Sequence, residues 1–171
     1  MKSLRIVSIT VLLAVAILAV RFSVGQAATT ITKGPAADYF ASAELQTMAA
    51  NVLNQAKASP NGSANLTFEK YPGHFINITA RTRDGGAELH QHFNDIFVVL
   101  DGEVTEVTGG TIPDVKIDPA TGEGHGAKIV GGTEHLLRKG DMLHISANTP
   151  HQSLVVPGKT FAAMVIKVHE D

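Results

Sequence analysis

From residue 66 onward, the chain alternates short runs of β-forming residues with turns rich in glycine and proline. Turn signals such as Pro72-Gly73 and Gly109-Gly110 separate the runs, and Asp101-Gly102 has the composition of a hairpin turn. Many short strands at such spacing are typical of an all-β sandwich or barrel. The predicted strands are 66–71, 75–82, 87–93, 96–100, 103–108, 127–130, 133–137, 142–146, 152–156 and 160–168.

Ahead of the strands, apolar residues recur at helical spacing from Ser42 to about Lys57. This pattern predicts an N-terminal amphipathic helix, with Ser42 as the expected N-cap. We expect its apolar stripe to pack on the outside of the β-domain or on a partner subunit, and the second alternative would make a homodimer. Residues 28–65 are therefore interpreted as a linker and a helix.

The first 27 residues have the pattern of a secretory signal peptide. Lys2 and Arg5 precede an apolar run over 6–20, and small residues surround the expected cleavage site after Ala27. The run is shorter than the roughly 20 residues that span a bilayer. We therefore expect an exported protein, periplasmic or extracellular, with no stable membrane association after cleavage. Arg21, between the run and the cleavage site, leaves an uncleaved N-terminal membrane anchor as the alternative.

The composition limits the chemistry of the mature domain. The chain has no cysteine, which excludes disulfides, thiolate nucleophiles and Cys-ligated zinc. Any transition-metal site must then use histidines and carboxylates. A formal net charge of −2 with no basic stripe argues against a nucleic-acid partner.

The segment Glu88-Leu89-His90-Gln91-His92 is the sharpest local feature. On a strand, alternate residues share a face, so Glu88, His90 and His92 would point the same way. Two imidazoles on one face can converge on a single ion. Two histidines at this spacing are weak evidence by themselves, and a second segment is needed to support a site.

That second segment opens with Gly140-Asp141 and ends at His151, after a turn that contains Pro150. The two segments together resemble the paired motifs of the cupin superfamily, and the resemblance covers roughly 67–168. The residues that match are Gly86, His90, His92, Asp95, the strand 96–100 and Gly102 in the first motif, and Gly140, Asp141, Leu143, Ile145 and His151 in the second.

The resemblance implies a double-stranded β-helix, the cupin jelly-roll barrel, over 66–171, in a small single domain of the cupin-2-like type. It also implies one divalent transition metal held by His90, His92, Asp95 and His151. Nitrogen-rich ligation without thiolates suits Mn, Fe, Ni, Cu or Zn, and the sequence does not choose among them.

The chain departs from the family pattern at three places. Asp95 stands where the motif has a glutamate and lies one residue closer to His92, so Glu88 remains an alternative source of the carboxylate ligand. Asn148 replaces the usual glycine of the second turn, where asparagine tolerates a left-handed backbone. The segment 111–132 is long, and we expect it to cap the barrel mouth or to form a partner interface.

Three imidazoles and one carboxylate leave positions on the ion open for water, substrate or dioxygen. The resemblance therefore implies a metal-dependent enzyme acting on a small organic molecule, of the dioxygenase, decarboxylase or isomerase type. The alternatives are a non-catalytic module that binds or senses a metal or small ligand, and a barrel that has lost its metal. His144 is interpreted either as a group near the ion or substrate or as a packed histidine.

Overall fold

The computed structural model describes residues 32–33 and 37–170. The predicted signal peptide or anchor over 1–27, and most of the predicted linker, lie outside the described residues. Among the residues described, no helix has the length and apolar character needed to cross a membrane.

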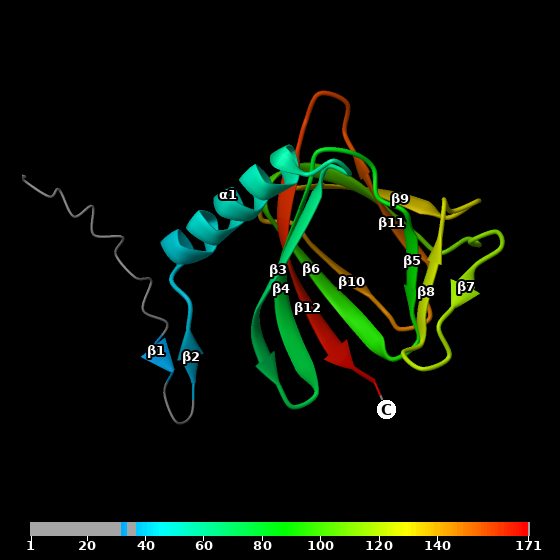
Figure 1. Cartoon of the computed structure of the whole chain (residues 1–171), viewed down its shortest axis with the longest axis horizontal. Coiled ribbons are helices and arrows are strands. Elements are labelled where there is room, and N and C mark those ends of the chain that lie inside the picture. The colour runs from blue at the N-terminus through cyan, green and yellow to red at the C-terminus, as the bar shows by residue number, and fades with distance from the viewer. Residues whose placement is uncertain (1–31, 34–36, 171) are drawn as a thin grey trace, which may run out of the picture. The chain divides into compact units, whose positions relative to one another are not determined.

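One helix and twelve strands make up the described part of the chain (Figure 1). They are β1 (Thr32–Lys33), β2 (Asp38–Tyr39), α1 (Ser42–Ala58), β3 (Ser63–Tyr71), β4 (His74–Arg81), β5 (Ala87–His90), β6 (Phe93–Thr108), β7 (Lys116–Ile117), β8 (Glu123–Gly126), β9 (Thr133–Arg138), β10 (Met142–Ile145), β11 (His151–Val155) and β12 (Phe161–His169). Strands β1 and β2 form a separate two-stranded sheet.

The long strand β6 organises the barrel because it belongs to two sheets. Its first half pairs with β12 and β10, and its second half pairs with β11 and β9. The first sheet therefore runs β3-β4-β12-β6-β10, and the second runs β9-β6-β11-β5-β8-β7. All of these pairs are antiparallel. The predicted all-β fold, a double-stranded β-helix, is confirmed.

The predicted hairpin at Asp101-Gly102 is wrong, because β6 continues through these residues without reversing. Gly102 has a φ of +74°, and the register of β6 against β12 shifts between Ala162 and Ala163. A β-carbon on Gly102 would lie 1.9 Å from the carbonyl oxygen of Thr160. Glycine here lets β6 bend from one sheet into the other.

Two apolar clusters lie on opposite faces of the first sheet. The inner cluster fills one end of the barrel interior and includes Phe97, Phe161 and Val165. The outer cluster joins the apolar stripe of α1 to the outward residues of the sheet, so the helix packs on the barrel exterior (Figure 1). Its members are Ala49, Val52, Leu53, Ala56, Ile78, Ala80, Leu100 and Ala162.

The predicted helix is present over Ser42–Ala58, but its N-cap differs from the one expected. Ala41, rather than Ser42, is the N-cap, and it has no side-chain oxygen to bond the first turn. The side chain of Glu44 compensates, since its Oε2 accepts a hydrogen bond from the backbone N–H of Ala41 at 3.2 Å.

The long segment 111–132 is more ordered than its sequence indicates. The strand predicted over 127–130 is wrong, and only Val130 makes an isolated bridge, to Thr111. Strands β7 and β8 lie in this segment instead, and β8 pairs with β5, which places Glu123 opposite His90. The segment thus extends the second sheet at the strand that carries the histidine.

Replacing Gly102 with alanine should destabilise the protein by at least about 3 kcal/mol, because left-handed strain adds to a clash with Thr160. Gly158 is the matched control, since its φ of +75° is nearly the same and, apart from its own chain neighbours, no atom of the described residues lies within 4 Å of the place that a β-carbon would take. Gly158→Ala should cost only about 1–2 kcal/mol. Urea unfolding of both variants measures the difference, and equal losses would contradict the role given to the close approach.

Candidate metal centre

Glu88, His90 and His151 converge at one end of the barrel interior. Glu88 and His90 are alternate residues of β5, so they share its inner face. His151 begins β11 and lies directly opposite Glu88 in the antiparallel pair. One ligand atom from each of the three side chains lies within 4.8 Å of the others, which is a group able to hold a metal ion.

Hydrogen bonds at the far nitrogens fix both imidazoles in the form a metal requires. Nδ1 of His90 lies 2.5 Å from Oε2 of Glu123, and Nδ1 of His151 lies 3.0 Å from the carbonyl oxygen of Thr149. Because both partners are acceptors, each Nδ1 carries a proton, which leaves Nε2 as the nitrogen that could bind a metal. A carboxylate or carbonyl behind a histidine is the usual support of a metal-bound imidazole.

Nε2 of His90 is buried and has no hydrogen-bond partner in the part of the chain that the structure describes. Burial, followed by the nearby Lys167 ammonium, lowers the pKa of His90 to about 4, so the ring is neutral near pH 7. An unpaired buried acceptor is costly. A divalent transition metal would satisfy it, and two nitrogens with one carboxylate are ligands that such an ion accepts.

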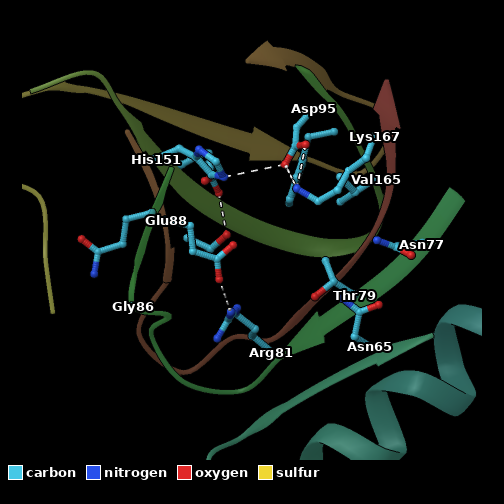
Figure 2. A pocket seen from close by; sticks show the side chains of 14 residues that line it. Asn65, Asn77, Thr79, Arg81, Gly86, Glu88, Asp95, His151, Val165 and Lys167 are labelled. Carbon is cyan, nitrogen blue, oxygen red and sulfur yellow. Dashed lines mark hydrogen bonds and ion pairs between the residues drawn. The ribbon is translucent and has the colours of Figure 1, made fainter. Parts of the chain in front are cut away.

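Asp95 lies beside this group but is already paired. Its Oδ2 is 3.6 Å from Nε2 of His90 and 3.7 Å from Nε2 of His151. Ligands at about 2.1 Å from a tetrahedral ion are about 3.4 Å apart, so Asp95 stands within reach of the same ion. However, the Lys167 ammonium donates to both carboxylate oxygens, at 2.8 and 2.9 Å (Figure 2).

The structure does not bring His92 into this group. Strand β5 ends at His90, so the predicted sharing of a face with His92 is wrong. The His92 side chain is exposed, and its ring stacks near that of His169 with centroids 6.2 Å apart. His144 is also exposed, on β10, while its neighbour Ile145 is buried.

The turn before His151 joins the two halves of the site. Asn148 has a φ of +61°, the left-handed backbone expected of this position. Its N–H donates to the carbonyl oxygen of His90 at 2.8 Å, and its side-chain amide donates to the carbonyl oxygen of Gln91. These bonds hold the start of β11 against the end of β5, and they place the two imidazoles with ring centroids 4.9 Å apart.

A cavity of about 90 Å³ adjoins the group on the inside of the barrel. Glu106 lies in its wall, only 1% exposed, and accepts a 2.7 Å hydrogen bond from the Ser153 hydroxyl. Burial raises the pKa of Glu106 to about 8, so this carboxyl is largely protonated at neutral pH. The lining residues are Asn65, Asn77, Thr79, Arg81, Gly86, Glu88, Asp95, Phe97, Glu106, His151, Gln152, Ser153, Val165 and Lys167.

Two residues of the site had signals in the sequence that were missed. Lys167 alternates with Val165 and Ala163 along an otherwise apolar strand, which places its side chain on the inner face. Glu123 lies between glycines, a strand composition that indicates close approach of another backbone.

A comparison with protein-family models and with curated proteins finds no match. Among solved structures, the chain is similar to TT1209 from Thermus thermophilus, at 15% identity over 66% of this chain and 89% of that one, with a TM-score of 0.49. It is also similar to the polyketide cyclase RemF from Streptomyces resistomycificus, at 16% identity over 63% and 66%, with a TM-score of 0.44.

A recombinant oxalate oxidase in complex with glycolate is a third similar structure, at 16% identity over 67% of this chain and 54% of that one, with a TM-score of 0.48. The chain thus spans about half of the oxalate oxidase that it matches. At these identities the likeness concerns the fold alone. The barrel described above has the predicted fold, while membership of the cupin superfamily and of its cupin-2-like type stay predictions.

Replacing Glu106 with glutamine should change how stability depends on pH. The pKa of Glu106 is about 8 in the folded protein, above the ordinary value of 4.5. The stability that the protonated carboxyl contributes is therefore fully present below pH 4.5 and is lost as pH rises from there through 8. Glutamine does not ionise. The melting temperature of Glu106→Gln relative to the parent should therefore rise by at least about 5 °C between pH 5 and pH 9.

Thermal unfolding at several pH values measures this difference. Glu103→Gln is the matched control, because Glu103 lies on the same strand and pairs with Arg138 and Lys159 instead of facing the cavity. A constant difference between Glu106→Gln and the parent across this range would contradict the protonated state of Glu106.

Proposed function

We propose that this chain is a metal-binding cupin whose barrel holds one divalent transition metal on Glu88, His90 and His151. The observation that carries the proposal is the buried, unpartnered Nε2 of His90, facing a second imidazole of the same tautomer. This ligand set keeps two of the three predicted histidines, leaves out His92, and takes Glu88 in place of Asp95 as the carboxylate. The identity of the metal among Mn, Fe, Ni, Cu and Zn stays open.

A bound ion would polarise an oxygen or nitrogen of a molecule that entered its open positions. The chain's own residues would do the rest. Glu123 and the Thr149 carbonyl hold the two rings in place, and the barrel wall limits the access of water. Glu106 would offer a proton donor at the cavity wall. We therefore propose a metal-dependent enzyme that acts on a small organic molecule.

The second candidate is a non-catalytic module that binds a metal or a small ligand. The Asp95–Lys167 pair favours it, because a carboxylate neutralised by an ammonium is a poor general base. Oxygen uptake or product formation by the metal-loaded protein discriminates the two functions, since a binding module would show a ligand-induced spectral change without turnover. Export through residues 1–27, and a homodimer, remain proposals from the sequence.

Removing either buried imidazole should remove the metal. We expect His90→Ala and His151→Ala to lose the stoichiometric metal of the parent, with a loss of affinity of at least about a hundredfold. His92→Ala and His144→Ala are matched controls, because both side chains are exposed, and they should keep the parent's metal content. Elemental analysis and the visible spectrum of the Co²⁺ forms measure the outcome.

The four variants test the ligand set against the one expected from the sequence. Loss of metal in His92→Ala to the same extent as in His90→Ala would contradict the ligand set proposed here and support His92 as the third histidine ligand. Far-UV circular dichroism of each variant separates loss of a ligand from loss of the fold.

Replacing Lys167 with methionine should tighten metal binding by at least about tenfold, because Asp95 then loses its ammonium partner and becomes free to coordinate. The metal-free variant should be less stable than the parent, and the metal should raise its melting temperature by more. Lys167→Arg keeps a cation at the pair and is the control. Calorimetric titration with Zn²⁺ measures the affinities, and an unchanged value in Lys167→Met would contradict the competition.

A further inference from the structure

One wall of the cavity carries polar side chains that barrel packing does not need. Asn77, Thr79 and Arg81 alternate along β4, so they share its inner face, and Asn65 of β3 pairs directly with Thr79. Figure 2 shows Asn65, Thr79 and Asn77 gathered across the pocket from His151. The other end of the same interior is filled by the apolar cluster around Phe161.

Asn77 points to a hydrogen-bond donor on whatever occupies the cavity. The residue is only 5% exposed, and its side-chain oxygen has no partner among the described residues. An amide oxygen only accepts hydrogen bonds, so a carboxylate or a carbonyl cannot satisfy it. A hydroxyl group on a bound molecule would satisfy it.

The charges of the cavity point to an anion. Arg81 and Lys167 balance Glu88 and Asp95 in the lining, and Glu106 is largely protonated. A divalent ion on Glu88 and the two imidazoles would then give the cavity a net charge of +2. The carboxylate of Glu123, behind His90, offsets one of these charges and leaves a net charge of +1. Burying an uncompensated charge is costly, so the loaded site would favour a ligand with one negative charge.

The space available limits the size of that ligand. Sites for drug-sized molecules have volumes of about 300–1,000 Å³, whereas this cavity has about 90 Å³. A molecule of a few heavy atoms fits such a space, and a nucleotide, a disaccharide or an aromatic polyketide does not.

We propose that the cavity binds a small monoanionic hydroxycarboxylate, with its carboxylate toward the metal and the cations Arg81 and Lys167 and its hydroxyl donating to Asn77. This inference rests on the proposed metal site, because the ion supplies the excess positive charge. It adds a class of ligand, and it adds Asn77 as the residue that accepts a hydrogen bond from the hydroxyl group. Neither follows from the metal ligands themselves.

The test uses the full mature chain loaded with Co²⁺, after its metal content has been measured. Three probes of matched size are titrated by calorimetry and by the visible spectrum: lactate, propionate, which lacks the hydroxyl, and lactamide, which lacks the charge. We expect lactate to bind at least about tenfold more tightly than propionate, since propionate leaves the Asn77 oxygen unpaired, and lactamide to bind most weakly.

Two variants assign these preferences to residues. In Asn77→Leu, the affinity for lactate should fall to that for propionate, while propionate binds as it does to the parent. In Arg81→Gln, the affinity for both acids should fall by at least about tenfold, while the metal is retained. Asn54→Leu, on the exposed face of α1, is the control and should leave all three affinities unchanged.

The outcomes separate the two proposals. A parent that takes up no metal overturns the metal site and, with it, the anion inference. A fully loaded parent that binds the three probes alike, or binds none, overturns the hydroxycarboxylate inference and leaves the metal site standing. A preference for lactate that survives in Asn77→Leu would falsify the role of Asn77.

Discussion

Closure of the second sheet by β11 is the constraint on which the site depends. Strand β11 pairs along its whole length with β6, and its first residue, His151, also pairs with Glu88 of β5. The turn before it is bonded to the carbonyl oxygens of His90 and Gln91. Residues more than fifty positions apart in the sequence are thereby fixed in one register, and the geometry of the two imidazoles follows from backbone pairing and not from side-chain flexibility.

Backbone pairing also explains why the rings are oriented. The register of β8 against β5 sets Glu123 directly opposite His90, and the carboxylate of Glu123 then holds Nδ1. The second ring is held by the carbonyl oxygen of Thr149 in its own turn. Glu123 belongs to a paired strand and Thr149 to a turn held by backbone hydrogen bonds, so the orientation of the two rings is fixed within the chain itself.

The fold and half of the site could be predicted from the sequence, because both depend on local rules. Turn residues and alternation identified the strands, and Asn148 took the left-handed backbone that its position requires. The same alternation rule was wrong for His92, since it holds only while the strand continues, and β5 ends at His90. No local pattern indicates that β5 ends at His90 and that Gln91 and His92 form the bend before β6.

The partners of the site were harder to predict for a different reason. That Lys167 lies on an inner face follows from alternation along β12, but its contact with Asp95 depends on the register of β12 against β6. The contact of Glu123 with His90 depends likewise on β8, whereas the strand predicted in this glycine-rich segment was placed at 127–130. Single-strand periodicity gives the face of a side chain, and only sheet register gives its neighbour.

The ion pair between Asp95 and Lys167 gives the barrel interior a charge balance that a site of histidines and carboxylates alone would lack. A buried carboxylate without a cation beside it would be strongly destabilised, and Lys167 supplies that cation from within the chain. The metal-free barrel is therefore close to neutral in its interior. A divalent ion would disturb this balance, and because Lys167 cannot leave a packed strand, an anion would have to offset the excess positive charge. The polar wall of β4, where the amide oxygen of Asn77 has no hydrogen-bond partner among the described residues, is suited to receive such an anion.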